Sequence, residues 1–399
     1  ANVLKRRMSD YALMETLDNG KPISESMSFD LPMAIGAFDF FAGAAFSLSG
    51  ESIDTDDSMC VVHREAIGVC AQIIPWNVPL IMMAGKLAPA LAAGNTVVLK
   101  PAESACLSVL EFIREVAELL PPGVVNVVTG YGADVGEALV ANNKVAKVAF
   151  TGSKPTAQKI MHYASTNIIP QTLELGGKSA NIICADADVD AAAESVAIST
   201  IFNKGEVCLA GTRVLVQESI QEEFLEKLKL ILDNVKIGDP RDPDTQLGAQ
   251  ASLAQYQKIQ SYLDIGRDEG ASVFLGGEVA AVAELPNGYF IKPTIFTGVN
   301  NKMRIAQEEI FGPVSCVIPW ADEEEALAIA NDSRYGLGGG LWTKDLARAH
   351  RMSRQMRTGT IWVNKYYNFI PGAPVGGYKE SGYGRENCME VLKHYTTTK

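Results

Sequence analysis

Apolar runs and helical periods alternate along the chain from residue 66 onward. Runs rich in Val and Ile occupy residues 67–74, 96–100, 124–129, 145–151 and 171–174. Between these runs, the helical spacing of apolar residues marks residues 80–93, 105–120, 134–141 and 156–164. Continuous apolar strands separated by helices predict a parallel sheet covered on both faces, a doubly wound layout typical of nucleotide-binding domains.

A second series of the same kind follows Gly176 and Gly177. It predicts strands at residues 180–185, 213–217 and 315–320, and helices at residues 220–234 and 323–331. The intervening residues 238–248 are rich in Pro, Asp and Gly, as expected of a surface connection. We therefore expect a second α/β domain after the first.

Two segments at the margins of this pattern have the character of β-arms. The polar segment 47–58 and a predicted strand at 59–65 interrupt the first domain, and the tail from Cys388 ends in a Thr-rich stretch. Either segment could pair with another subunit. The chain starts at Ala1 inside a helix-like pattern without an initiator Met or a signal peptide, so we interpret it as the remainder of a longer protein whose N-terminal part is missing.

The composition of the 399 residues narrows the class of function. Hydrophobic residues make up 47% and charged residues 21%, which is the balance of a folded globular protein. The formal charge of −12 disfavours nucleic acid and anionic membranes as partners. We take residues 78–94 as the longest apolar stretch, and Lys86 and Pro89 interrupt it, so no membrane span is predicted.

The cysteines and histidines give no sign of a metal or disulfide framework. Seven cysteines lie at wide spacing without a C-x-x-C pair, which favours a reducing, cytoplasmic setting. The four histidines are scattered and form no ligand motif, so no metal site is predicted.

Cys208 is a candidate nucleophile. It lies in the segment FNKGEVCLAGTR, in a loop bounded by glycines ahead of a predicted strand. A free thiol has a pKa of about 8.5, so it reacts at neutral pH only where the pKa is lowered or a base stands beside it. Cysteines are more often inert core residues, and position alone leaves both interpretations open.

Glu174 and Asn77 are candidates for the accompanying polar chemistry. Glu174 ends a predicted buried strand in LELGGKS, where it could act as a general base or pair with a lysine. Asn77 lies in the turn IPWNVP, where its amide could donate to a developing oxyanion or cap the following helix.

Three further groups suit a nucleotide. Lys100 and Glu103 of VVLKPAE follow a strand at the sheet edge where doubly wound folds bind ligands, and could hold a ribose diol. Gly152 and Ser153 of FTGSKPT precede a helix, a place suited to pyrophosphate. Gly132 belongs to GYGADVG, whose spacing G-x-G-x-x-x-G differs from the dinucleotide fingerprint.

Together and in order, seven motifs resemble the NAD(P)-dependent aldehyde dehydrogenase superfamily. They are IPWN, VLKPAE, FTGS, LELGGK, the Gly-Glu-Val-Cys-Leu-Ala-Gly loop, EEIFGPV and GGYKESGYGRE, within a match from about residue 67 to the end. The resemblance implies a Rossmann-type cofactor domain, a second α/β catalytic domain and a small β oligomerisation arm. Their implied bounds are 1–46 with 66–175, 176–380, and 47–65 with 386–399, respectively.

The resemblance also implies the roles of single residues. Cys208 would be the nucleophile, Glu174 the general base, and Asn77 with the backbone N–H of Cys208 the oxyanion hole. Glu386, with Lys86, resembles a member of a proton relay. The residues that would contact the cofactor are Ile74, Pro75, Trp76, Lys100, Glu103, Gly132, Gly152, Ser153, Glu309 and Phe311.

The implied reaction is oxidation of an aldehyde to its carboxylic acid with NAD(P)+, through a cysteine thiohemiacetal and a thioester. The Glu103 carboxylate would repel a 2′-phosphate, which favours NAD over NADP. Val78, Gly85 and Val375 stand where the family commonly carries aromatic residues, which predicts tolerance of bulky or branched aldehydes. We also expect a homodimer or homotetramer with no nucleic-acid or membrane partner.

Two alternative functions stay open. In a CoA-acylating semialdehyde dehydrogenase, CoA instead of water takes the acyl group, but such relatives tend to lack the base at Glu174. The other alternative is a catalytically silent structural or binding protein on the same scaffold. The joint presence of Cys208, Glu174 and Asn77 speaks against it.

Overall fold

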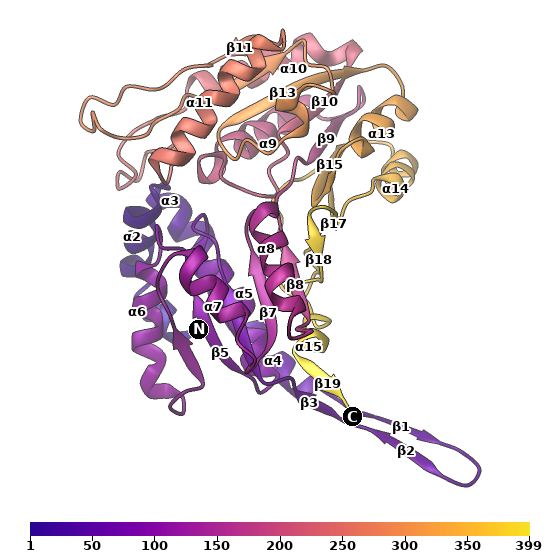
Figure 1. Cartoon of the computed structure of the whole chain (residues 1–399). Coiled ribbons are helices and arrows are strands. Elements are labelled where there is room, and N and C mark those ends of the chain that lie inside the picture. The colour runs from indigo at the N-terminus through magenta and orange to yellow at the C-terminus, as the bar shows by residue number, and fades with distance from the viewer.

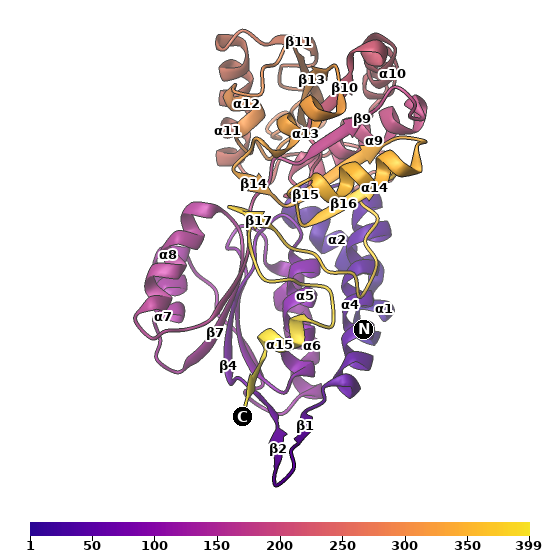
Figure 2. The ribbon, with the colours of Figure 1, turned by 90° about the vertical axis from the view of Figure 1, so that its right-hand side faces the viewer.

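The computed structural model describes residues 1–399 and shows two lobes, with a β-hairpin that projects from one of them (Figure 1 and Figure 2). The lobe that carries the hairpin holds a six-stranded sheet. Its strands, in spatial order, are β18 (Gly382–Tyr383), β8 (Gln171–Glu174), β7 (Val145–Thr151), β4 (Val69–Ile73), β5 (Thr96–Lys100) and β6 (Val125–Val127). All neighbours are parallel except β18, which pairs antiparallel with β8.

Helices connect these strands and cover the sheet. They are α5 (Pro79–Ala92), α6 (Leu107–Val116), α7 (Glu137–Val140) and α8 (Lys154–Ser165). Pro79 occupies the first turn of α5, where the missing N–H is not needed for helical hydrogen bonding. β7 is buried at all but one position, as a strand covered on both faces requires.

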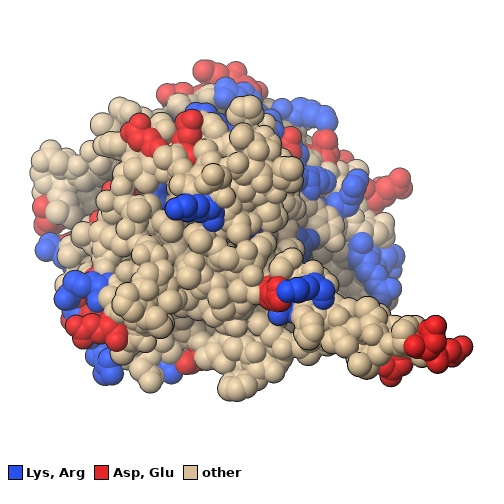
Figure 3. Space-filling model, turned by 60° about the horizontal axis from the view of Figure 1, so that its bottom comes forward, with Lys and Arg blue, Asp and Glu red and all other residues tan.

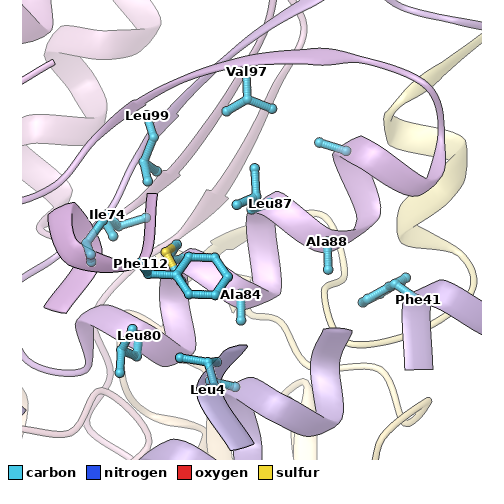
Figure 4. Packing of buried hydrophobic residues seen from close by; sticks show 14 of the residues in the cluster. Leu4, Phe41, Ile74, Leu80, Ala84, Leu87, Ala88, Val97, Leu99 and Phe112 are labelled. Atoms are coloured by element: carbon cyan, nitrogen blue, oxygen red, sulfur yellow. The ribbon is translucent and has the colours of Figure 1, made fainter. Parts of the chain in front are cut away.

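The N-terminal helices pack against α5 and complete the core of this lobe. They are α1 (Asn2–Arg6), α2 (Met8–Asn19), α3 (Ile23–Glu25) and α4 (Leu31–Ala44). Figure 4 shows Leu4 of α1 near Leu80 of α5, and Phe41 of α4 near Ala88 of α5. Phe112 of α6 belongs to the same cluster, so apolar residues from the whole first third of the chain form one core.

One helical stretch is long and apolar enough, by length and composition only, to cross a membrane. It spans Ile23–Ser47 with a mean hydropathy of 1.3, and 28% of the tested window is buried. The core helix of an ordinary folded protein passes the same test, and α4 within this stretch packs on α5. The sequence analysis took residues 78–94 as the longest apolar stretch and overlooked this one.

The second lobe holds a seven-stranded sheet. In spatial order its strands are β11 (Ser272–Leu275), β12 (Thr294–Thr297), β13 (Val314–Trp320), β10 (Arg213–Gln217), β9 (Ala180–Ile183), β15 (Gly338–Trp342) and β16 (Thr360–Val363). Only β11 runs antiparallel to its neighbour. The helices are α9 (Val189–Ile201), α10 (Gln221–Asp233), α11 (Leu253–Asp268), α12 (Arg304–Gln307), α13 (Glu323–Asn331) and α14 (Leu346–Gln355).

The last part of the chain returns to the first lobe. β14 (Tyr335–Gly336) pairs with β17 (Tyr378–Lys379), and β18 then joins the six-stranded sheet. After α15 (Val391–His394), β19 (Thr396–Thr398) pairs antiparallel with β3 (Arg64–Ala66). The chain therefore crosses between the lobes more than once.

The projecting hairpin consists of β1 (Glu51–Asp54) and β2 (Met59–Val62), which pair only with each other. Almost all of its residues are exposed on both faces. Figure 3 shows acidic residues at the tip of this arm, where Asp54, Asp56 and Asp57 lie. The predicted strand at 59–65 is thus two strands, β2 and β3, with His63 between them.

The predicted fold class is confirmed: both parallel sheets are present, and each predicted strand and helix is found with ends shifted by a few residues. In the second lobe, the hydrophobic pattern missed α9, α11, α12, α14, β11, β12, β15 and β16. It also missed α3, α4, β1, β14, β17, β18 and α15.

Candidate active site

A pocket of about 140 Å³ lies where the two lobes meet, and four of the predicted residues line it. Asn77 precedes α5, Glu174 ends β8, Cys208 follows α9, and Glu386 follows β18. These segments are far apart in the sequence, and the two sheets bring them to one place. The structure therefore groups Cys208, Glu174, Asn77 and Glu386 as the sequence analysis expected.

The loop that carries Cys208 has an unusual backbone. Asn203, Lys204 and Gly205 follow one another with φ angles of 45°, 60° and 74°, all in the left-handed region. A Cβ atom at Gly205 would lie 2.1 Å from the carbonyl carbon of Gly312, so only glycine fits there. The turn ends α9 abruptly and directs the following residues, including Cys208, into the pocket.

The Cys208 thiol is neutral in this arrangement. Burial first, and then the nearby carboxylates of Glu309 and Glu174, which oppose a thiolate, raise the pKa of Cys208 to about 12. Backbone hydrogen bonds within residues 208–209 act in the opposite direction. Attack by this sulfur therefore requires a base that removes its proton.

Glu174 is a buried carboxyl without a fixed partner. Its Oε1 atom accepts no hydrogen bond, and the residue is 8% exposed. Burial first, and the charge of Glu386 second, raise the pKa of Glu174 well above its ordinary value, while Lys86 and Arg385 oppose this. A carboxyl whose pKa is raised in this way binds a proton more strongly than an ordinary glutamate and is a stronger base when ionised.

Glu386 lies between this carboxyl and a fully buried lysine. The Lys86 Nζ atom on α5 is 2.5 Å from Oε1 of Glu386, whose side chain is 13% exposed. The ion pair joins α5 to the segment that follows β18. β18 pairs with β8, and Gly382 is the residue opposite Glu174. Lys86 and Glu386 are therefore neighbours of the Glu174 carboxyl, which itself has no hydrogen-bond partner.

Asn77 does not cap the helix that follows it. The N-terminus of α5 has no side-chain cap, and Nδ2 of Asn77 donates to the carbonyl of Glu206 at 2.9 Å. One amide hydrogen is thus engaged, and a primary amide has a second one to offer. The capping interpretation is wrong, and the amide is held against the Cys208 loop.

Aromatic side chains that the sequence analysis did not name form much of the apolar wall. They are Phe29, Phe202, Tyr367 and Phe369. The rings of Phe29 and Phe202 meet edge to face with centroids 4.8 Å apart. Val78, Gly85 and Val375 line the same pocket, so small and aromatic residues share the wall. The ring positions depend on three distant segments, which no local motif reveals.

Glu309 lies next to the crossing between the lobes. Its Oε1 accepts the N–H of Gly177 at 3.0 Å, and a Cβ at Gly176 would lie 2.4 Å from its Oε2. Burial raises the pKa of Glu309, whereas Gly177, Lys258 and Lys178 oppose the shift. Lys258 of α11, which the sequence analysis did not single out, is thus a second charged group here. Burial lowers its pKa, and Glu309 opposes that shift.

The predicted aromatic cofactor contacts also meet. Trp76 and Phe311 contact each other edge to face, with ring centroids 5.4 Å apart, and Phe311 has a left-handed φ of 61°. Trp76 follows β4, whereas Phe311 belongs to the second lobe, so the contact spans the junction of the lobes. Ile74 and Pro75 precede Trp76, and the N–H of Ile74 donates to the carbonyl of Lys100 at 3.1 Å.

Lys100 and Glu103 lie at the carboxyl edge of the six-stranded sheet. Nζ of Lys100 donates to the carbonyl of Pro101 at 3.0 Å and lies 3.5 Å from Oε2 of Glu103. Ser153 is the N-cap residue of α8, but its side chain caps no backbone N–H and instead contacts Thr156 at 3.0 Å. The backbone N–H groups of Lys154 and Thr156 are therefore left free of a side-chain cap for an anion, whereas Pro155 between them has no N–H.

Gly152 and Gly132 differ in what surrounds them. A Cβ at Gly152 would lie 2.5 Å from the ring of Phe150, whereas a Cβ at Gly132 would meet nothing within 4 Å. A side chain at position 152 would therefore have to displace the ring of Phe150, whereas one at position 132 would displace nothing. Taken together, a polar sheet edge at Lys100, a helix N-terminus at Ser153 and a buried carboxylate at Glu309 are groups that could bind the parts of a dinucleotide.

Comparison with known proteins places the chain in a family. The model of the Aldehyde dehydrogenase family matches residues 1–399. An aldehyde dehydrogenase of Paracoccus denitrificans is 50% identical, and the match covers 100% of this chain and 80% of the relative. Acetaldehyde dehydrogenase 2 of Cupriavidus necator is 49% identical, with 100% and 81% covered. The chain belongs to the aldehyde dehydrogenase family.

Solved structures agree with this placement. Indole-3-acetaldehyde dehydrogenase of P. syringae, in complex with NAD+ and IAA, superposes with a TM-score of 0.97 at 44% identity, covering 100% of this chain and 81% of that one. The NAD+ complex of aldehyde dehydrogenase from Bacillus cereus gives 0.97 at 40% identity, with 100% and 81% covered. The chain is an NAD(P)-binding enzyme that oxidises aldehydes to carboxylic acids.

Proposed function

We propose that Cys208 attacks the aldehyde and that Glu174 serves as the general base of both half-reactions. The single observation that carries this is the meeting of Cys208, Glu174 and Asn77 in one pocket. Because burial keeps the thiol protonated, its proton must leave as the C–S bond forms, and the ionised form of Glu174 is the base beside it.

Asn77 stabilises the oxyanion of the thiohemiacetal. The free hydrogen of its amide and the backbone N–H of Cys208 donate to the oxygen that becomes negative when sulfur adds. Nδ2 is held by Glu206, so the amide is oriented before substrate binds. Donors fixed in advance need no reorganisation during the reaction, which is why such a pair accelerates addition.

Water then releases the acid product from the thioester on Cys208. Glu174 removes a proton from that water, and the carboxyl has no other partner to compete for it. Glu386 and Lys86 adjust the proton affinity of Glu174 from the outer side of the pocket. The presence of this base favours hydrolysis over transfer of the acyl group to CoA.

The predicted cofactor residues suit NAD. When bound, the dinucleotide supplies the hydride acceptor of the reaction. Lys100 and Glu103 would hold the adenosine ribose, Ser153 at the start of α8 the pyrophosphate, and Glu309 the nicotinamide ribose. The Glu103 carboxylate opposes a 2′-phosphate, which favours NAD over NADP.

The substrate side favours uncharged aldehydes of benzaldehyde size or branched shape. Apart from Glu174 and Glu386, the pocket is lined mainly by apolar side chains. Its volume of about 140 Å³ is close to that of cavities of ~150 Å³ that take up benzene in other proteins. Val78, Gly85 and Val375 leave room that larger side chains would fill.

We assign a cofactor domain to 1–46 and 66–175 and a catalytic domain to 176–380, which contain most strands of the six-stranded and the seven-stranded sheet, respectively. The segments 47–65 and 386–399 form an arm that joins subunits into a homodimer or homotetramer. Its hairpin is exposed on both faces, and an isolated hairpin is only marginally stable in water, so a partner surface would stabilise it. We place the enzyme in the cytoplasm, since all seven cysteines are free thiols.

Absorbance at 340 nm tests this function. The purified chain is mixed with NAD+ and a panel from acetaldehyde to benzaldehyde, with and without CoA. We expect CoA-independent NADH formation, with higher kcat/KM for benzaldehyde than for acetaldehyde. Cys208→Ala should abolish it, whereas Cys106→Ala, another partly exposed thiol outside the pocket, should not. Full turnover by Cys208→Ala would disprove the assigned nucleophile, and a strict requirement for CoA would replace hydrolysis by acyl transfer.

A further inference from the structure

A buried polar network lies behind the reaction pocket and ties the end of α2 to the Cys208 loop. Lys204 is fully buried, and its Nζ atom donates to the carbonyl of Asn19 at 3.0 Å and pairs with Oε2 of Glu206 at 2.9 Å. The Asn19 side chain in turn donates to the carbonyl of Trp76 at 2.8 Å. One lysine therefore connects α2, the Cys208 loop and the segment before Asn77.

The same network holds Asn77 by both its side chain and its peptide. Asn203 Nδ2 donates to the carbonyl of Asn77 at 2.9 Å, while Asn77 Nδ2 donates to the carbonyl of Glu206 at 2.9 Å. The backbone N–H of Asn203 donates to Oε2 of Glu25 at 2.8 Å. Glu206 is anchored from the other side, since its Oε1 accepts the N–H of Ala251 at 3.1 Å.

These contacts act on the turn at Asn203 and Lys204, whose backbone conformation is unfavourable without them. Asn203 and Lys204 both have left-handed dihedral angles, which residues with a Cβ adopt unfavourably, Lys more so than Asn. Such a conformation persists only where surrounding interactions determine it. Glu25 accepts a hydrogen bond from the backbone N–H of Asn203. Asn19 and Glu206 bind the side chain of Lys204.

Stability alone is a poor explanation for these buried charges. A buried ion pair is often no more stabilising than apolar residues of the same volume, because both charges lose their hydration. An apolar replacement could fill the space but could not hold the carbonyls and amides that orient Asn77. The arrangement is therefore better explained by the geometry that it imposes.

We propose that Lys204 and Glu25 are positioning residues for the reaction: they fix the left-handed turn so that the free amide hydrogen of Asn77 and the sulfur of Cys208 face one carbonyl group. The inference rests on the proposed roles of Asn77 and Cys208. Neither Lys204 nor Glu25 lines the pocket, so both act through Asn77 and the loop.

A double-mutant cycle on the full chain tests this. Asn77→Ala should lower kcat by about 10²- to 10³-fold, the loss of one oxyanion donor. Lys204→Met should lower kcat by about 100-fold through misplacement of the same donor, with a much smaller change in KM. Because both changes remove one function, the double variant should be no more than a few-fold slower than Asn77→Ala.

Arg348→Met is the matched control. Arg348 pairs with Asp186 at 2.8 Å and Glu323 at 2.7 Å in the second lobe, away from the pocket. This variant should keep kcat near the parent value, and its effect should multiply with that of Asn77→Ala. A Lys204→Met effect that also multiplies with Asn77→Ala would show a general structural role and overturn the proposal.

A second pair of variants covers failure of Lys204→Met to fold. Glu25→Gln retains an oxygen that can accept the N–H of Asn203, whereas Glu25→Ala does not. Folding is checked by circular dichroism, and kcat is measured on folded protein. We expect Glu25→Ala to lower kcat at least 10-fold and Glu25→Gln to restore most of it. Folded Glu25→Ala with full kcat overturns the proposal, whereas full kcat in Asn77→Ala overturns the oxyanion role itself.

Discussion

Two buried lysine–glutamate pairs flank the reaction pocket, and they differ in what surrounds their carboxylates. In the pair Lys204–Glu206 both side chains are fully enclosed, and neither lines the pocket. In the pair Lys86–Glu386 the carboxylate borders the pocket next to Glu174. The first pair holds backbone in place, whereas the second adjusts the protonation of a neighbour. The same two residue types thus serve geometry or acid–base chemistry according to their access to the cavity.

The largest expected effect concerns Glu174. Of the two pairs, only Lys86–Glu386 acts on the pKa of this residue. In Glu174→Gln, hydrolysis of the thioester should slow by about 10²- to 10⁴-fold, the range of general acid–base catalysis. If the thiol can lose its proton by a slower route, NADH should appear as one equivalent per site and then stop. Rapid-mixing absorbance at 340 nm measures both phases. Steady turnover at the parental rate would remove Glu174 from the mechanism.

The next effect separates the two pairs by stability. Lys204→Met leaves Glu206 buried without its cation and should lower the free energy of unfolding by about 3–5 kcal/mol. Lys204→Met combined with Glu206→Leu should recover much of that loss, yet kcat should stay low because the carbonyl of Asn19 has lost its donor. Urea unfolding with parallel kinetics measures both quantities. If stability and kcat recovered together, Lys204–Glu206 would have no separate role in holding the backbone, and the contrast between the two pairs would be wrong.

A smaller effect is expected on pH dependence. Glu174 must be ionised to act as a base, and the charge of Glu386 raises the pKa of Glu174. Glu386→Gln should therefore make ionisation easier and move the acidic limb of kcat to lower pH, by up to about 1 pH unit. Glu206→Gln should not shift the acidic limb of the pH profile of kcat. A shift in the opposite direction would show that loss of the Lys86 contact outweighs loss of the charge.

The smallest effect is expected at an ion pair on the surface of the second lobe. Arg351 pairs with Glu323 at 2.7 Å, with 48% and 31% of the two side chains exposed. Arg351→Met should change the free energy of unfolding by at most about 1 kcal/mol, since water and salt screen exposed charges. Urea unfolding at two salt concentrations measures it. A loss as large as that of Lys204→Met would contradict the contrast between buried and exposed pairs.

Short motifs were sufficient to name Cys208, Glu174 and Asn77 as candidates, but not to assign their roles. Each motif alone also allowed a structural interpretation, and the roles came from the order of the motifs, which resembles that of a known family. The parallel strands were also predictable, because strands buried on both faces have continuous apolar runs. What no motif revealed was the network behind Asn77, since Glu25 and Asn203 are 178 residues apart.

Strand β15 shows why part of the second sheet escaped prediction. Its sequence GGGLW begins with three glycines, which local propensity assigns to a turn. A Cβ at Gly338 would lie 2.8 Å from Leu209, and one at Gly339 would lie 2.6 Å from Met356. The glycines are there because neighbouring side chains fill the space. Such a requirement is set by tertiary packing and cannot be inferred from the strand's own residues.

The return of the C-terminal segment to the first lobe makes the pocket a product of long-range folding. β18 pairs with β8 at Glu174, and the charge of Glu386 acts on the same carboxyl, although both come more than 200 residues after it in the sequence. Contacts between residues so far apart pay a large loop-closure entropy before they form. We therefore expect the surroundings of Glu174 to be completed late in folding, after the second lobe has brought the chain back.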